Sequence, residues 1–347
     1  MAYVIIGATG HIGNNLVRML VEENQEVKVL VRKIDRSIEN LNVTYIVGDV
    51  LNKEFLLKNI NKNDIVIHLA GIIDIKNKLQ KETNDINYLG TVKVVNASIE
   101  KNAKRLIYLS TVDCIYKETM DEVVKEPTRM RVEMFNQNYP ISKAKATEYV
   151  MRKMNEKHNT TIAIVYPSCV FGINDYKPSA IGRVILDSIN GKMQFGINGG
   201  YNFIDVVDLV KAIITLSKMD NNDSYILSGY NITVRKMYET INKVLGVNKK
   251  IRNVPMFLVK LAIPFVSYLS NFTLKTITEN CNYDNSKAVE ELGFSLTSFE
   301  ESMKNTIEWF KENLEYFKKW VWYYEKVFIY FSNYFCYILI RMYSSIY

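Results

Sequence analysis

The sequence has few of the residues that build metal sites and disulfide frameworks. Its 347 residues include only four cysteines and three histidines, and both kinds are scattered. No C-x-x-C pair or other metal-ligand spacing occurs, so we expect no metal site and a reduced compartment, the cytoplasm. The opening run YVIIG (residues 3–7) follows no basic leader and is too short for a signal peptide, so it does not predict secretion.

A strong charge of one sign and long apolar runs are also missing. Basic residues number 44 against 37 acidic ones, with no dense basic stripe, so nucleic acid is not an expected partner. The longest uncharged run near the C-terminus, residues 327–340, would form a helix of about 21 Å, shorter than the roughly 30 Å of a hydrocarbon core. We therefore expect no membrane-spanning helix there.

Aromatic residues are the one excess. They make up 12% of the chain, and 14 of the 41 fall in residues 316–347. Apolar (48%) and charged (23%) residues are otherwise close to ordinary globular usage. The length allows two or three compact units, and the excess marks the C-terminal tail as different from the rest.

Hydrophobic periodicity in the first half alternates short β-branched runs with amphipathic segments. Continuous apolar strands separated by helices predict a parallel sheet covered on both faces, a doubly wound α/β fold of Rossmann type. We expect a nucleotide-binding domain at 1–170 and a smaller α+β substrate lobe at 171–314, packed as one body with the first and able to return strands and helices to its core. An aromatic tail is expected at 315–347. The expected strands are Tyr3–Ile6, Val27–Val31, Val43–Val47, Ile65–Leu69, Leu106–Leu109 and Thr161–Val165.

A glycine-rich segment, GATGHIG, joins the first expected strand to the first expected helix. Glycines there permit a tight turn and the close approach of backbone N–H groups to a pyrophosphate, which a helix N-terminus attracts. The alternative is a structural turn that only closes the strand onto the helix. We interpret the His11 side chain as tolerated at a turn position. The residues assigned to cofactor binding are Gly7, Thr9, Gly10, His11, Ile12 and Gly13.

The end of the second expected strand suggests which dinucleotide binds. An acidic residue there would bind the 2′-hydroxyl of NAD, whereas an arginine accommodates the 2′-phosphate of NADP. Here the strand runs into Arg32 and Lys33, with Arg36 close behind, and Asp35 comes late. The pattern favours NADP over NAD; a solvated basic turn is the alternative.

Tyr139 and Lys143 stand four residues apart in an expected helix, so both lie on one face. A nearby ammonium favours the phenolate and would bring the pKa of the tyrosine toward a useful acid/base range. An exposed helix face is the alternative, because the chain has 23 tyrosines and many lysines.

Motifs in register over roughly residues 1–314 resemble the extended short-chain dehydrogenase/reductase family. This group includes NAD(P)-dependent epimerases and dehydratases, and enzymes similar to dihydroflavonol reductase and to 3β-hydroxysteroid dehydrogenase. The motifs are GATGHIG (7–13), GDV (48–50), HLAG (68–71), NYLGT (87–91), YLST (108–111), YPISK (139–143), PSCVFG (167–172), FIDVVD (203–208) and KAVEELGF (287–294).

The resemblance implies roles for single residues. Tyr139 would be the acid/base, Lys143 would tune it and hold the nicotinamide ribose, and the Thr111 hydroxyl would bind the substrate oxygen. Ser110 would lie at the cofactor, with a buried structural hydroxyl as the equal alternative. The remaining cofactor contacts implied are Asp49 and Val50 at the adenine, Leu69, Ala70 and Gly71 near the ribose, and Pro167, Cys169 and Val170 at the nicotinamide.

Departures from the family pattern narrow the reaction. Val112 stands where dehydratases carry an acidic residue, which disfavours dehydration, and Tyr166 replaces a frequent arginine before Pro167. Cys114 and Cys169 are interpreted as small buried hydrophobic residues.

Three functions remain open from the sequence. The first is hydride transfer between NADP(H) and a ketone or secondary alcohol of a fairly apolar small molecule. The apolar stretch Val254–Phe272 motivates it, although a helix packing within the lobe would explain that stretch as well. The second is a sugar-nucleotide 4-epimerase with tightly bound NAD, for which Arg183, Arg235 and Arg252 could bind a pyrophosphate. The third is a cofactor sensor without turnover, disfavoured by the intact Thr111, Tyr139 and Lys143.

The tail beyond Leu314 combines tryptophans and tyrosines with flanking lysines, which is typical of membrane interfaces. We expect a peripheral membrane contact through residues 315–347. The alternatives are packing on the enzyme, a homodimer contact, or an extension under little constraint.

Overall fold

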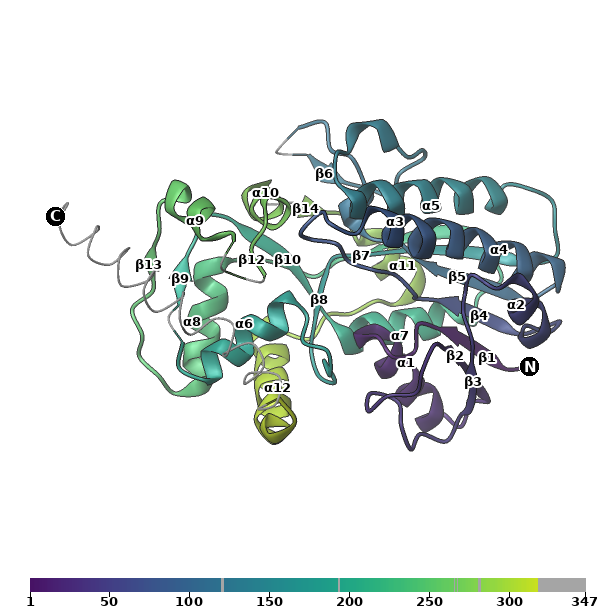
Figure 1. The fold of residues 1–347 in the computed structure, drawn as a ribbon, viewed down its shortest axis with the longest axis horizontal. Helices are drawn as coiled ribbons and strands as arrows, with labels where there is room; N and C mark the ends of the chain where they lie inside the picture. Colours follow the sequence, from purple (N-terminus) through teal and green to yellow (C-terminus); the bar gives the residue numbers. More distant parts are fainter. Residues whose placement is uncertain (120–121, 193, 265, 267, 280–281, 318–347) are drawn as a thin grey trace.

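The computed structural model describes residues 1–119, 122–192, 194–264, 266, 268–279 and 282–317. Its centre is a seven-stranded sheet (Figure 1) in which every neighbouring pair is parallel. The continuous apolar runs explain this arrangement, since most of these strands are buried on both faces. In spatial order the strands are β11 (Asp223–Leu227), β7 (Thr161–Pro167), β5 (Arg105–Leu109), β4 (Ile65–His68), β1 (Tyr3–Ile6), β2 (Val27–Val31) and β3 (Thr44–Val47).

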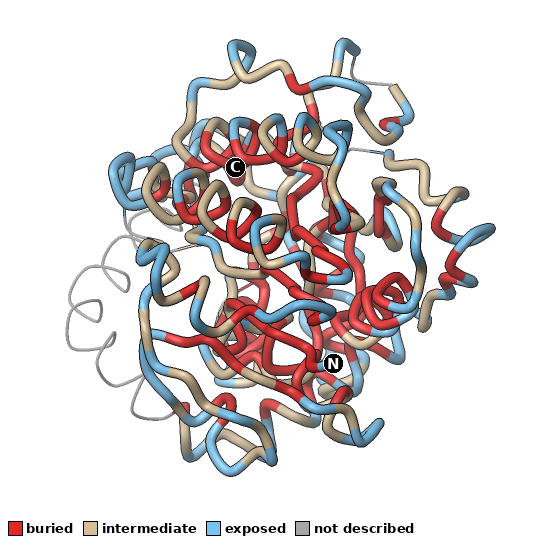
Figure 2. The backbone as a smooth tube through the Cα atoms, turned by 90° about the vertical axis from the view of Figure 1, so that its right-hand side faces the viewer, coloured by how far each residue is buried: buried red, intermediate tan, exposed pale blue. Residues whose placement is uncertain are grey.

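Helices cover both faces of the sheet, as the sequence predicted, and the strands between them are the buried centre of the molecule (Figure 2). One face packs against α1 (His11–Glu22), α7 (Val206–Ser217) and α11 (Ser286–Leu292). The other packs against α2 (Lys53–Asn59), α4 (Thr91–Glu100) and α5 (Asn138–Met154). Short elements complete this half: α3 (Gln80–Thr83), the π-helical turn η1 (Asn84–Gly90), the 3₁₀ turns η2 (Val112–Cys114) and η3 (Val132–Met134), and the pair β6 (Val123–Val124) and β14 (Asn282–Tyr283).

The smaller lobe has its own core beside the carboxyl ends of the sheet strands. Its strands are β8 (Cys169–Phe171), β10 (Gly200–Asp205) and β12 (Tyr230–Thr233), with the pair β9 (Phe195–Gly196) and β13 (Arg252–Asn253). Its helices are α6 (Ala180–Ile189), α8 (Val234–Leu245), α9 (Met256–Ala262), α10 (Asn271–Glu279) and α12 (Phe299–Glu312).

The chain does not divide at residue 170. After β8 and β10 it returns to the large sheet, because α7 and α11 cover one face and β11 adds the edge strand beside β7. Residues 1–170 therefore make an incomplete sheet, and the lobe is formed by segments on either side of this return.

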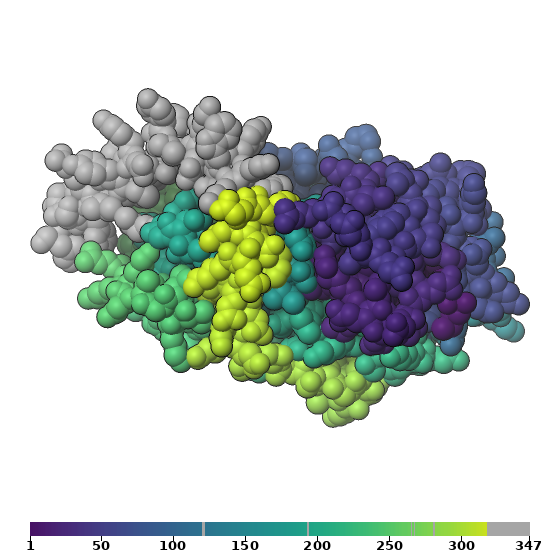
Figure 3. Space-filling model, turned by 90° about the horizontal axis from the view of Figure 1, so that it is seen from below, coloured from purple at the N-terminus to yellow at the C-terminus, as the bar shows by residue number. Residues whose placement is uncertain are grey.

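The C-terminal end of the described chain belongs to the lobe. Phe317 is fully buried among Phe310 and Trp309 of α12, and Leu314 packs against the same core. The boundary expected at residue 315 thus lies inside a packed segment, and the aromatic excess begins within the enzyme core. Figure 3 shows α12 in yellow beside the N-terminal half of the molecule.

Residues 318–347, most of the expected membrane-contacting tail, lie outside the described residues. Among the residues that are described, no helix combines the length and the apolar character that crossing a membrane requires.

Candidate active site

The glycine-rich turn lies at the carboxyl end of β1 and against the end of β4. Gly7 has φ +98°, and a Cβ on it would lie 2.6 Å from the Ala70 nitrogen. A Cβ on Gly13 would lie 2.2 Å from the Gly7 oxygen. Only glycine therefore fits at these two positions. The structure brings the turn together with Leu69, Ala70 and Gly71, at the point where the strand order of the sheet reverses.

The first turn of α1 is suited to an anion. Its first N–H groups have no intrahelical acceptor, and the N-cap residue Gly10 has no side chain to occupy them. The backbone of His11, Ile12 and Gly13 therefore fits a dinucleotide pyrophosphate, whose negative charge the helix N-terminus favours. The uncapped N–H groups at the start of α1 therefore fit the dinucleotide that the family resemblance implies.

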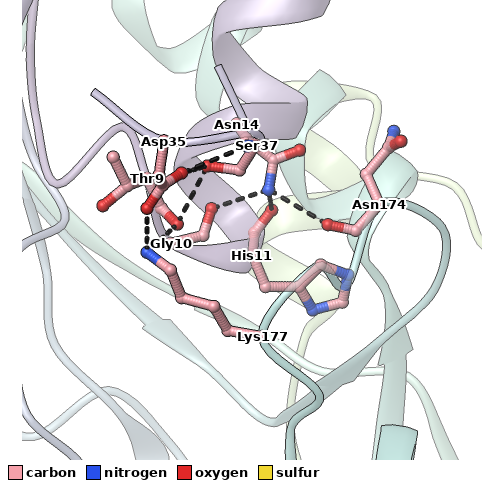
Figure 4. A network of polar contacts seen from close by, with 8 residues as sticks. All are labelled: Thr9, Gly10, His11, Asn14, Asp35, Ser37, Asn174 and Lys177. Atoms are coloured by element: carbon pink, nitrogen blue, oxygen red, sulfur yellow. Dashed lines mark hydrogen bonds and ion pairs between the residues drawn. The ribbon is translucent and has the colours of Figure 1, made fainter. Parts of the chain in front are cut away.

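A segment from the lobe crosses this turn (Figure 4); we call residues 172–179, between β8 and α6, the strap. The His11 ring bonds to the Ile173 oxygen at 2.9 Å, so its side chain holds the strap. The Asn14 amide donates to the oxygens of Gly10 (2.8 Å) and Asn174 (3.1 Å). These bonds join the turn to the strap.

Further along the strap, Lys177 reaches the loop after β2. Its ammonium lies 2.7 Å from the Asp35 carboxylate and donates to the Thr9 oxygen at 3.0 Å. The Ser37 hydroxyl donates to Asp35 at 2.5 Å. Burial opposes ionisation of Asp35, but the bonds from Lys177 and Ser37 outweigh it and lower its pKa. Asp35 thus lies at the glycine-rich turn although it comes late in the sequence, while Arg32 is exposed.

The residues expected at the adenine and nicotinamide lie on either side of this turn. Asp49 follows β3, and its carboxylate accepts a hydrogen bond from the Leu51 nitrogen at 2.8 Å. Val50 lies against Gly90, since a Cβ added to Gly90 would lie 3.3 Å from the Val50 side chain. Pro167 ends β7, and Cys169 and Val170 form β8. Burial, with the charge of Asp113, raises the pKa of the Cys169 thiol to about 12, so the thiol stays protonated.

Thr111, Tyr139 and Lys143 come together where β5 ends against the start of α5. Thr111 is the N-cap of η2, and Tyr139 is the second residue of α5; both are buried. The Lys143 ammonium donates to the Leu109 oxygen at 2.5 Å and lies 4.6 Å from the centre of the Tyr108 ring. Ser110 is also buried, and its hydroxyl lies 2.6 Å from that of Thr147, a structural bond behind the site.

Burial dominates the electrostatics of this corner. It raises the pKa of Tyr139 well above its usual value, the charge of Asp113 raises it further, and the Thr111 hydroxyl opposes the shift only in part. Burial also lowers the pKa of Lys143 to about 8. Lys143 is directed at the Leu109 carbonyl in this arrangement, so any lowering of the Tyr139 pKa by the ammonium does not outweigh the effect of burial.

Asp113 is a site residue that sequence reasoning missed. Its carboxylate accepts from the Thr111 hydroxyl at 3.3 Å, and burial raises its pKa to about 6. The charge of Glu279 on α10 adds to this shift. Asp113 directly follows Val112, the position at which the family's dehydratases carry an acidic residue. Its proximity to Tyr139 and Glu279 depends on the tertiary fold, so the local sequence does not reveal it.

The lobe covers the catalytic corner through α10. Phe272 packs edge-on against Tyr139, with ring centres 6.3 Å apart. Lys76, in the loop after β4, holds this cover in place by donating to the oxygens of Ile263 (3.1 Å), Val266 (3.0 Å) and Leu269. The stretch Val254–Phe272 is not one helix: α9 packs Val259 into the lobe, and Phe272 reaches the site.

The glycine-rich turn and the Tyr–Lys pair both lie at the carboxyl ends of the strands of a Rossmann sheet. This arrangement is typical of the extended short-chain dehydrogenase/reductase class. Residues 4–228 match the family model described as the 3-beta hydroxysteroid dehydrogenase/isomerase family. The chain belongs to this family and is an enzyme of the extended short-chain type, dependent on NAD(P).

Relatives cover nearly the whole described chain. A putative dihydroflavonol 4-reductase of Synechocystis sp. (strain ATCC 27184 / PCC 6803 / Kazusa) is 27% identical over 326 residues, 89% of this chain and 94% of the relative. The UDP-glucose 4-epimerase of Thermotoga maritima has a TM-score of 0.75 at 20% identity, over 90% of this chain and 100% of that one. The structure of MoeE5 with UDP-glucose and NAD has a TM-score of 0.72 at 18% identity, over 90% and 100%. The two structures are similar in fold.

Proposed function

We propose that the protein transfers hydride between NADP(H) and a ketone or secondary alcohol of a fairly apolar small molecule. The observation that carries this is the buried phenol of Tyr139 beside the Thr111 hydroxyl, at the same sheet edge as the glycine-rich turn. A phenol with a raised pKa is protonated at neutral pH, and so can donate a proton to an oxygen that becomes an alkoxide.

Each residue then has a defined part. When bound, the nicotinamide supplies hydride to the carbonyl carbon or takes it from the alcohol carbon. Tyr139 Oη gives its proton to the carbonyl oxygen during reduction and takes it back during oxidation. The Thr111 hydroxyl orients the same oxygen, and the buried Lys143 ammonium supplies positive charge that stabilises the phenolate left after proton transfer.

An apolar substrate is supported by the cover over the site. Phe272 packs edge-on against Tyr139 and places an apolar ring beside the phenol. The description of the matching family names hydroxysteroids, and the Synechocystis relative is named for a dihydroflavonol. Both are ring systems with a secondary alcohol or a ketone, which fits this cover.

A sugar-nucleotide 4-epimerase is the second candidate, favoured by the likeness to the Thermotoga maritima enzyme. It would require lobe arginines at a substrate pyrophosphate. Arg235 and Arg252 are both exposed on the lobe, on α8 and β13.

One set of measurements tests the proposal. The purified protein is incubated with NADPH and a panel of flavonoid, steroid and simple cyclic ketones, and NADPH consumption is followed by absorbance. We expect turnover with apolar ketones and none with UDP-sugars. Protein that retains NAD through purification and interconverts UDP-glucose and UDP-galactose would instead establish the epimerase.

A further inference from the structure

The strap carries a positive charge to the side of the cofactor site that separates NADP from NAD. Lys177 belongs to the segment after β8, yet its ammonium contacts both Asp35 (2.7 Å) and the Thr9 oxygen (3.0 Å). No sequence signal marks it, because it lies far along the chain from the glycine-rich turn that it contacts. Figure 4 shows its side chain directed at this turn.

Asp35 poses a problem for NADP. A carboxylate beside the adenosine ribose binds the 2′-hydroxyl of NAD and repels the 2′-phosphate of NADP. Its lowered pKa keeps Asp35 ionised at neutral pH. The exposed Arg32, the residue that favoured NADP in the sequence, leaves this negative charge in place, because Arg32 forms no ion pair with Asp35 among the described residues.

The pairing with Lys177 resolves this conflict. The ammonium neutralises Asp35 and brings a positive charge to the backbone of the glycine-rich turn itself. Lys177 is about half exposed and Asp35 less so. The ammonium has three donors, and Asp35 and the Thr9 oxygen take two of them, so one remains for a phosphate oxygen while Asp35 stays neutralised.

We propose that Lys177 is a specificity-determining residue for the cofactor: by neutralising Asp35 it admits the 2′-phosphate of NADP, and without it the site prefers NAD. This inference rests on the proposed use of NADP(H). The specificity determinant is then shared by both halves of the molecule.

The test measures binding in the full-length protein and needs no substrate. Dissociation constants are determined by calorimetry for NADPH and NADH, and for adenosine 2′,5′-bisphosphate and 5′-AMP, a pair that differs only in the 2′-phosphate. For Lys177→Met we expect NADPH and the bisphosphate to bind about tenfold more weakly or worse, because a charge-assisted contact to phosphate is lost. NADH and AMP should bind unchanged or more tightly.

Two further variants give opposite signs. Asp35→Asn removes the repulsion and should tighten NADPH while weakening NADH; Lys177→Arg should keep the preference of the wild type. The matched control is Lys192→Met. Lys192 follows α6 and pairs at 2.9 Å with Asp187, near the end of that helix, with nearly the same exposure as Lys177. It should change none of the four constants.

The outcomes separate the two proposals. Wild-type protein that binds neither dinucleotide would overturn the proposed function. If both bind and Lys177→Met weakens NADPH and NADH equally, Lys177 is only a structural part of the strap and the inference is overturned. Equal constants for the variant and the wild type would overturn it as well. Melting temperatures of the variants confirm that each is folded, and Lys177→Arg decides the question if Lys177→Met is not.

Discussion

The two ends of the proposed site use charge in opposite ways. At the catalytic corner Tyr139 and Lys143 are buried, and burial itself shifts both pKa values toward the neutral forms. At the ribose corner Asp35 and Lys177 are partly exposed, and their pairing helps to lower the pKa of Asp35, which keeps its carboxylate ionised. Proton transfer needs a site shielded from water, in which the phenol of Tyr139 keeps its proton until the reaction. Recognition of a phosphate instead needs charged groups that remain accessible to water and to the ligand.

The largest effect should come from Tyr139→Phe, which removes the hydroxyl group that donates the proton and keeps the aromatic ring. We expect turnover to fall about 10²- to 10⁴-fold, the usual contribution of a general acid. The dissociation constant for NADPH should change by less than about twofold, because the aromatic ring and its contact with Phe272 remain. Steady-state kinetics and cofactor titration measure the two quantities; a Tyr139→Phe enzyme with full activity would refute the assigned role.

Lys143→Met tests whether burial of the Lys143 ammonium sets its pKa and its contribution to stability at the catalytic corner. Turnover should fall by about 100-fold as the positive charge is lost. The folded-state pKa of about 8 lies below the unfolded value, so the ammonium destabilises the fold at pH 7 and this penalty disappears as the pH rises above about 10.5. The variant should therefore melt at pH 7 no lower than the wild type. A clear loss of melting temperature at pH 7 would show that the bond to Leu109 outweighs burial.

Asp113→Asn should have a smaller effect that depends on pH. The folded-state pKa of about 6 lies above the unfolded value, so stability is lost as the pH rises through 6. At pH 7.5 the variant should be more stable than the wild type by about 1–2 kcal/mol, less than the full shift implies because the side chain is partly accessible. At pH 4 the two should unfold alike. Urea unfolding at both pH values measures this, and equal differences at both would contradict the shift.

Lys76→Met should have the smallest effect, because Lys76 acts only on the cover. Losing its bonds to the oxygens of Ile263, Val266 and Leu269 should loosen the segment above Tyr139. We expect KM for an apolar ketone to rise about threefold with little change in NADPH affinity. An equal loss of NADPH affinity would mean that the two ends are not independent.

The sequence predicted the sheet better than the site. Strands such as Tyr3–Ile6 and Val27–Val31 have the predicted bounds, because buried parallel strands are continuous apolar runs. The edge strand Asp223–Leu227 was not predicted, since it begins with two polar residues and is recognised only by its pairing with β7. The periodicity of residues 87–101 also predicts a helix there; in the structure this helix begins earlier, as the π-helical turn η1.

Local spacing also limits what can be predicted of the site. The glycine-rich turn and the Tyr139–Lys143 pair are each contained within a few residues, so their geometry follows from one turn and one helix. Asp35, Asp113 and Lys177 gain their surroundings from residues far along the chain. The pKa shifts of Asp35 and Asp113, and the ion pair of Lys177, arise only after the lobe has packed, and hydrophobic periodicity does not encode that packing.

The strap has a consequence for how the protein folds. Arg18 lies over the ring of Tyr176, and Arg36 over that of Tyr316, so the strap and the C-terminal segment both hold the nucleotide half. A dinucleotide bound at the glycine-rich turn would depend on a site that segments from both halves hold in place. Ligand concentration then acts on the unfolding of the lobe as well as that of the sheet, since a ligand that binds only the native state stabilises everything its site requires. The bound cofactor would therefore stabilise the packing of the lobe against the sheet. Removing it should make the lobe susceptible to proteolysis before the sheet becomes susceptible.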